Sequence, residues 1–135
     1  MNGRISAKWK LDLLETRGFT REQSRFESGP GTNPEELIGG AHAACFSMAL
    51  AGNLAQAGYS PETIETTAKV SIEKGREGYA ITRILLDTQA IVPDIDEDTF
   101  LEQAEIAKST CPVSQALAAT EIDLQARLIA PQPVE

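Results

Sequence analysis

The chain has 135 residues, of which 41% are hydrophobic and 24% are charged, and these values predict one globular domain over residues 1–135 with a core of its own. Its formal net charge of −8 argues against binding to nucleic acid or to anionic membranes, because their phosphates attract basic surfaces. Two cysteines and one histidine, with no CxxC or HxxxH spacing, predict neither a metal site nor a disulfide scaffold, and we expect no cofactor.

The N-terminal region predicts a strand followed by irregular structure. The opening MNGRISAKWK contains no apolar signal core, so we expect a cytoplasmic protein. From Ile5 to Leu13, hydrophobic and polar residues alternate, which indicates a half-buried strand. Residues 15–31 are polar, with Phe19 and Phe26 as the main apolar residues, and they predict loop and strand pieces.

The next segment predicts a long helix. Thr32 or Asn33 can cap it, and Pro34 suits the first helical position. No Asp, Glu, Lys or Arg occurs from Leu37 to Pro61, and a helix without a charged side is buried all round. Polar residues and glycines within the stretch argue against a membrane span. Because one short chain has little room to surround such a helix, we expect burial at the interface of a two-fold dimer.

The remaining elements follow in the order strand, strand, helix, helix, strand. Residues 66–74 and 79–92 predict two strands joined by a hairpin turn at residues 75–78. A helix is expected from about Asp96, and a second, short helix from Cys111 to about Ala118. The last strand is expected at Glu121–Ile129. This order lacks the regular alternation of a parallel sheet, so we predict an α+β fold with an antiparallel sheet.

The two cysteines lie in different local environments. Cys45 lies within the uncharged helix, where a cysteine commonly serves as a small buried hydrophobic residue. Cys111 precedes Pro112 at a helix start, where free backbone N–H groups favour a thiolate, so local physics alone points to Cys111 as the more reactive thiol. His42, three residues before Cys45, is either a core or interface histidine or one half of a Cys–His pair for acyl transfer.

The two cysteine segments also carry a family resemblance. TNPEELIGGAHAACFSMAL, together with the later CPVSQAL, resembles the osmotically inducible protein C branch of the OsmC/Ohr family, and a weaker likeness extends from about Arg25 to Leu128. The resemblance implies an OsmC-like fold, with antiparallel sheets around a long buried central helix, in an intertwined homodimer with active sites at the subunit interface. It implies a peroxidase that reduces organic hydroperoxides, with hydrogen peroxide as a further candidate, and that uses an external thiol reductant. Residues 1–31 form a region that is shortened relative to the family.

The same resemblance assigns roles to four residues. It implies that Cys45 attacks the peroxide and that Cys111 resolves the resulting sulfenic acid as a disulfide. Arg25 would stabilise the Cys45 thiolate, and Glu35 would hold Arg25 through a carboxylate–guanidinium pair. Arg21 is the alternative to Arg25, because the shortened region can shift the strand register. A non-catalytic or redox-sensing binding protein on the same fold is the alternative function.

The position of Glu35 raises a geometric question. Cys45 follows it by ten residues, which is about 15 Å along one straight helix, so the two side chains could not share a site. Gly39-Gly40 lies between them, and we therefore expect a break or sharp bend at these glycines.

Overall fold

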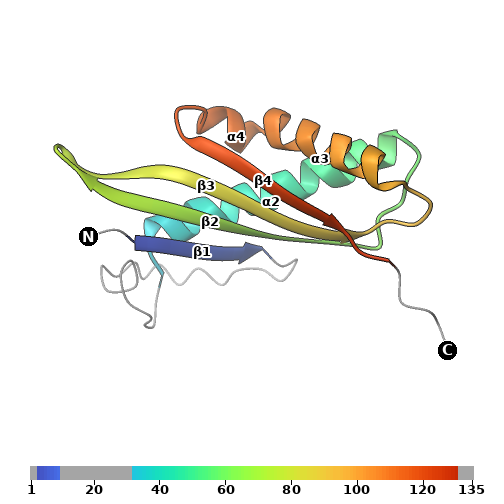
Figure 1. The fold of residues 1–135 in the computed structure, drawn as a ribbon, viewed down its shortest axis with the longest axis horizontal. Coiled ribbons are helices and arrows are strands. Elements are labelled where there is room, and N and C mark those ends of the chain that lie inside the picture. The colour runs from blue at the N-terminus through green and yellow to red at the C-terminus, as the bar shows by residue number, and fades with distance from the viewer. Residues whose placement is uncertain (1–2, 10–31, 131–135) are drawn as a thin grey trace.

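The structure is a computed structural model that describes residues 3–9 and 32–130. Within these residues the three helices lie on one side of a four-stranded sheet (Figure 1). The elements in chain order are β1 (Gly3–Trp9), α2 (Pro34–Gln56), β2 (Thr63–Gly75), β3 (Gly78–Ile91), α3 (Glu97–Thr110), α4 (Pro112–Ala116) and β4 (Glu121–Leu128). The predicted order of elements is thereby confirmed from the first strand onward, while residues 10–31 lie outside the described part of the chain.

Helix α2 begins where its sequence predicts, and a glycine follows its last turn. The side-chain oxygen of Asn33 accepts a hydrogen bond from the Glu36 backbone N–H at 2.8 Å, and Pro34 occupies the first helical position. After the last turn, Gly58 has a φ of 94°, a left-handed conformation that terminates helices and that glycine adopts at little cost. These local signals position the whole helix relative to the sheet.

The predicted break at Gly39-Gly40 is wrong. Helix α2 is one continuous α-helix of 23 residues that passes through both glycines. A glycine costs a helix about 1 kcal/mol relative to alanine, and both glycines lie on the buried side of α2, where packing outweighs that cost. Glu35 and Cys45 therefore lie on one uninterrupted helix.

The sheet is mixed, so the predicted all-antiparallel sheet is wrong. The strand order is β1-β2-β3-β4. The β1–β2 and β2–β3 pairs are antiparallel, and a tight turn joins β2 to β3 where Gly75 lies opposite Gly78. In contrast, β4 runs parallel to β3, with Ile122 beside Ile84. Parallel neighbours need a long crossover connection, and α3 with α4 forms it. The fold class remains α+β.

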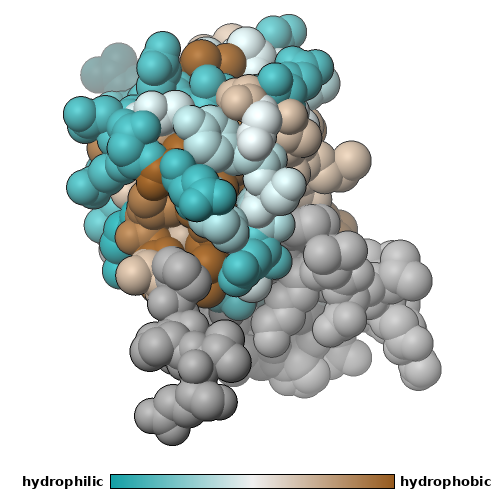
Figure 2. Space-filling model, turned by 90° about the vertical axis from the view of Figure 1, so that its right-hand side faces the viewer, coloured by the Kyte–Doolittle hydropathy of each residue, from teal (hydrophilic) through white to brown (hydrophobic). Residues whose placement is uncertain are grey.

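The core lies between the sheet and the helices. Alternate residues of β2 and β3 point toward α2 and are buried, as their period of two predicts. Residues of β4 that share one face, Ile122, Leu124, Ala126 and Leu128, pack against the same core. In the end-on view of Figure 2, hydrophilic residues cover much of the described surface, and apolar residues gather in a smaller area beside the grey atoms. The largest side chains of the core are Phe46, Leu50, Leu54, Val70, Ile84, Leu86 and Phe100.

Candidate active site at the two cysteines

A proline creates the site at Cys111. A residue before proline is disfavoured in helical conformation, and Cys111 accordingly has a ψ of 131° that separates α3 from α4. Pro112 then opens α4, as predicted. In this extended conformation the Cys111 sulfur caps α4 and accepts the backbone N–H of Ser114 at 3.4 Å. The break between the helices thus fixes the direction of the sulfur.

The start of α4 brings the two cysteines together. Helix α4 packs against α2, and the thiols of Cys45 and Cys111 interact directly. Pro112 has no backbone N–H. The next two backbone N–H groups of α4 each donate to one sulfur, Val113 to Cys45 and Ser114 to Cys111. Both cysteines are free thiols in this structure. The structure therefore brings together the two thiols whose pairing the resemblance implied.

The two sulfurs differ in exposure. Cys111 is fully buried, whereas Cys45 is partly exposed on α2. Burial raises the pKa of the Cys45 thiol; the Val113 N–H opposes this shift, and the neighbouring Cys111 adds to it. No lysine or arginine of the described residues contributes to the shift. Within the described part of the chain, Cys45 is thus a protonated thiol at neutral pH, and an active thiolate needs a cation from elsewhere.

The structure separates Glu35 from Cys45 of the same chain. Glu35 lies in the first turn of α2 and is 9% exposed. Ten residues of unbroken helix, about 15 Å of rise, lie between it and Cys45. Arg25 and the alternative Arg21 lie outside the described residues. The described residues therefore supply the two cysteines of the predicted site but do not bring Glu35 to them.

Ser114 is a site residue that sequence reasoning missed. Its hydroxyl oxygen lies 2.7 Å from His42 Nε2 and 3.5 Å from the Cys111 sulfur. His42 is fully buried, and burial lowers its pKa, so the imidazole is neutral at neutral pH. One interpretation of the sequence paired His42 with Cys45. The structure instead connects His42 through Ser114 to Cys111. The available signal was the spacing in Cys-Pro-Val-Ser, which places Ser114 one turn after the cysteine.

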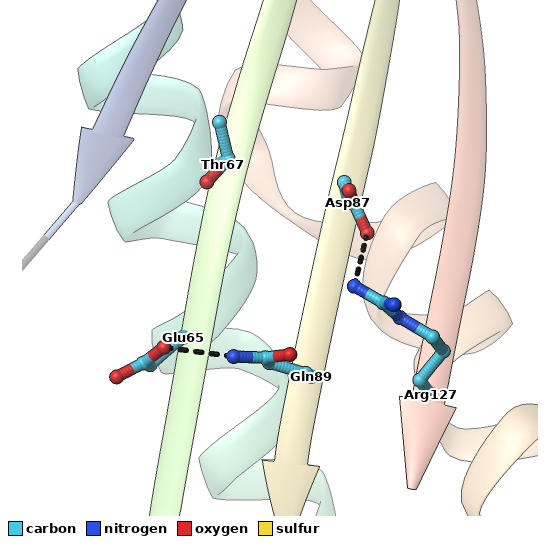
Figure 3. A pocket seen from close by; sticks show the side chains of 5 residues that line it. All are labelled: Glu65, Thr67, Asp87, Gln89 and Arg127. Atoms are coloured by element: carbon cyan, nitrogen blue, oxygen red, sulfur yellow. Dashed lines mark hydrogen bonds and ion pairs between the residues drawn. The ribbon is translucent and has the colours of Figure 1, made fainter.

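A polar pocket on the other face of the sheet is not part of this site. Figure 3 shows it on β2, β3 and β4, with the helices behind the strands. Its volume is about 100 Å³. The Gln89 side chain donates a hydrogen bond to the Glu65 carboxylate at 3.0 Å, and Arg127 forms an ion pair with Asp87 at 3.7 Å. Such pairs are typical of a solvated sheet face and contribute little stability. The pocket holds no thiol, so the cysteine pair remains the candidate active site. Its lining residues are Glu65, Thr67, Asp87, Gln89 and Arg127.

Comparison with known proteins decides the family. The family model described as OsmC-like protein matches residues 27–126. The peroxiredoxin OsmC of Escherichia coli K12 is 47% identical over 134 residues, which cover 90% of this chain and 93% of that protein. The chain belongs to the OsmC-like family. The peroxiredoxin OsmC of Shigella flexneri matches with the same identity and coverage.

Solved structures of OsmC-like proteins share the fold. The organic hydroperoxide resistance protein OhrB of Bacillus subtilis aligns with a TM-score of 0.61 and 28% identity, over 75% of this chain and 73% of that one. An OsmC-like protein of unknown function from Vibrio cholerae aligns with a TM-score of 0.64 over 71% of this chain and 64% of that one, and at 18% identity it supports the fold alone. The mixed α+β arrangement described above is thus that of OsmC and Ohr proteins.

Proposed function

We propose that this chain is a thiol-dependent peroxidase that reduces organic hydroperoxides, with Cys45 as the attacking and Cys111 as the resolving cysteine. The observation that carries the proposal is the contact between a partly exposed sulfur and a fully buried one. A peroxide from solvent reaches Cys45 first, and Cys111 is already beside the product. The names of the relatives, peroxiredoxin and organic hydroperoxide resistance protein, support the same reaction and substrate class.

The reaction proceeds in three steps. The Cys45 thiolate attacks the terminal peroxide oxygen; the O–O bond breaks, the alkoxide takes a proton and leaves as the alcohol, and Cys45 becomes a sulfenic acid. Cys111 then attacks the Cys45 sulfur, forming the S–S bond and releasing the hydroxyl group with a proton as water. Two external thiols reduce the disulfide by exchange, through a mixed disulfide. No metal or cofactor is required for any of these steps.

The proposed cation is Arg25, held by Glu35. Because burial raises the Cys45 pKa, a guanidinium beside the sulfur is the group that would restore the thiolate. Since α2 is unbroken, Glu35 cannot reach Cys45 of its own chain along the helix. Glu35 of one subunit serving Cys45 of the other, in an intertwined homodimer, is consistent with this geometry. In that dimer α2 becomes the buried central helix.

The outer side of α2 supports such a dimer. Met48 is 68% exposed and Leu37 is 39% exposed, Ala41 between them is exposed as well, and no charged residue occurs from Leu37 to Pro61. By length and composition, α2 could also cross a membrane, and less than half of that stretch is buried within the protomer. A second copy of α2 would cover the apolar side without a membrane. We accordingly propose a cytoplasmic homodimer.

Mass spectrometry after one equivalent of cumene hydroperoxide tests the cysteine roles. The wild-type protein should form the Cys45–Cys111 disulfide. Cys45→Ser should not react with the peroxide, whereas Cys111→Ser should carry a sulfenic acid on Cys45 that a dimedone-type probe traps, and excess peroxide should convert it to the sulfinic acid. A sulfenic acid on Cys111 in the Cys45→Ser protein, formed at the wild-type rate, would reverse the roles.

Turnover distinguishes the enzyme from its alternative. With dithiothreitol as the reductant, a peroxidase consumes many equivalents of hydroperoxide per chain. A redox-sensing binding protein would form one disulfide and then return slowly to the dithiol. A wild-type protein that consumes no more than one equivalent over the course of the assay would contradict the proposed activity.

A further inference from the structure

A buried chain of contacts leads from His42 to the resolving cysteine. His42 Nε2 lies 2.7 Å from Ser114 Oγ, and this oxygen lies 3.5 Å from the Cys111 sulfur. The Ser114 backbone N–H reaches the same sulfur at 3.4 Å. His42 and Cys111 are fully buried and Ser114 is 5% exposed. The sulfur of Cys111 therefore has two donors from one residue, and one of these donors is held in place by a histidine.

We propose that the Ser114 hydroxyl is a catalytic hydrogen-bond donor to the Cys111 sulfur and that His42 is its positioning residue. The pair acts where Cys111 carries negative charge, namely when it attacks the sulfenic acid and when it leaves during reduction of the disulfide. The inference rests on the proposed function for the first of these steps. For the second step, reduction of the disulfide, the inference does not depend on the proposed function, because Cys111 is the same leaving group whichever oxidant formed the disulfide.

The hydrogen positions follow from the contacts. A serine hydroxyl has one proton, and a neutral imidazole has one N–H. When His42 donates from Nε2 to Ser114 Oγ, the hydroxyl proton is directed at the Cys111 sulfur. The other tautomer would turn this proton away from the sulfur and would bury an N–H at His42 Nδ1, which has no hydrogen-bond partner among the described residues. A buried N–H without a partner is costly, which favours the first tautomer.

The donors act on the thiolate of Cys111. In the reductive step, an external thiolate attacks the more exposed sulfur, Cys45, and forms a mixed disulfide with it. The S–S bond breaks, and Cys111 leaves with the electron pair as a thiolate. The Ser114 O–H and N–H stabilise this developing charge in a buried site that excludes water. Cys45 instead receives the Val113 N–H, so the Ser114 hydroxyl is not expected to affect the attack on peroxide.

The test compares two buried serines. Ser114→Ala removes the proposed donor, and Ser47→Ala is the matched control, since Ser47 is 2% exposed and its hydroxyl bonds Thr66 at 2.6 Å on the core side of α2. In Ser114→Ala, we expect conversion of the sulfenic acid to the disulfide to slow about tenfold, as for the loss of one hydrogen bond to a charged atom. Oxidation of Cys45 by cumene hydroperoxide should stay within about twofold. Ser47→Ala should change neither rate beyond that margin.

A second arm needs no peroxide. The disulfide is formed with diamide, and its reduction by dithiothreitol is followed by rapid quenching; Ser114→Ala should again be about tenfold slower. Ser114→Thr, which keeps the hydroxyl, should restore most of the rate. This arm still decides the role of Ser114 if the wild-type protein proves inactive toward hydroperoxides, so the two proposals fail separately.

Substitutions of His42 test its positioning role. His42→Gln can keep an N–H near Nε2 and should lie closer to the wild-type rates than His42→Leu, which cannot donate. A His42→Leu protein that keeps the wild-type rates of disulfide formation and reduction would overturn the role of His42. If His42→Leu does not fold, His42→Gln is combined with Ser114→Ala, and a double variant that is slower than Ser114→Ala alone would show that His42 does not act through Ser114. Equal rates for Ser114→Ala and Ser114→Thr, or equal slowing of Cys45 oxidation and disulfide formation, would overturn the role of Ser114.

Discussion

The two sides of α2 have similar composition but different surroundings. On the inner side, Phe46, Leu50 and Leu54 are fully buried against the sheet and α3. On the outer side, Leu37 and Met48 are exposed in the protomer, with Cys45 between them. Both sides lack charge, so an uncharged sequence alone does not distinguish a core from an interface. The inner side fixes the helix, and the outer side carries the sulfur of Cys45, which is the proposed attacking atom.

The candidate active site lies along the boundary between these two sides. His42 and Cys45 are three residues apart on α2, yet His42 is fully buried and Cys45 is partly exposed. Helix α4 lies against this boundary and contacts both residues, through Ser114 and Val113. A rigid core on one side thereby positions a thiol that solvent can reach on the other.

The largest expected effect contrasts an inner with an outer residue of α2. Phe46→Ala should destabilise the fold by about 4 kcal/mol, because it leaves a cavity in the core, and urea unfolding measures this loss. Met48→Asp should leave the protomer folded but dissociate the dimer at micromolar concentration, because it places a charge on the proposed interface. Sedimentation velocity checks this second outcome. A Met48→Asp protein that remains a stable dimer would remove the outer side of α2 from the interface.

The next largest effect concerns Arg25, the proposed cation beside the Cys45 sulfur. Arg25→Ala should lower the peroxidase rate about a hundredfold and shift the pH–rate profile to higher pH, because the Cys45 pKa, already raised by burial, loses its proposed cation. Arg21→Ala is the matched control and should remain active. Stopped-flow oxidation of Cys45 across pH measures both variants. A crippled Arg21→Ala beside a normal Arg25→Ala would transfer the role to Arg21.

The sequence predicts local features of this molecule better than long-range ones. The cap at Asn33 and the helix start at Pro112 depend on neighbouring residues, and both are found as predicted. The break at Gly39-Gly40 was predicted from propensity alone, but burial of that side of α2 overrides propensity. The parallel pairing of β4 with β3 depends on where a two-helix crossover returns the chain, which the pattern of the strand does not encode.

The same limit applies to the site. The family resemblance of two sequence motifs predicted the pairing of Cys45 with Cys111, and the structure brings these two thiols together. The contact of His42 with Ser114 joins residues on α2 and α4 that are distant in sequence, and each alone resembles an ordinary core residue. Only the packing of α4 against α2 shows that these two residues lead to Cys111.

The smallest effect isolates the histidine on the inner side. Burial lowers the pKa of His42 below its usual value of 6.5, so below pH 6.5 the unfolded chain binds a proton that the folded chain does not. The free energy of unfolding should therefore be fully retained above pH 6.5 and should fall, by at most about 1.4 kcal/mol per pH unit, until the folded-state pKa is reached.

Urea unfolding of the wild type and of His42→Gln between pH 5 and pH 8 measures this contribution. The variant should be less stable at pH 7.5 but should lose less stability on acidification, because it has no imidazole to protonate. Asp96 does not interfere, since hydrogen bonds from Thr99 lower its pKa below 3.8, and the stability it contributes is lost only at lower pH. Parallel pH profiles for the two proteins would mean that the pKa of His42 is the same in the folded and unfolded chains, so that the folded protein also takes up this proton below pH 6.5. The buried hydrogen bond to Ser114 would then need a charged donor rather than the neutral one inferred from its burial.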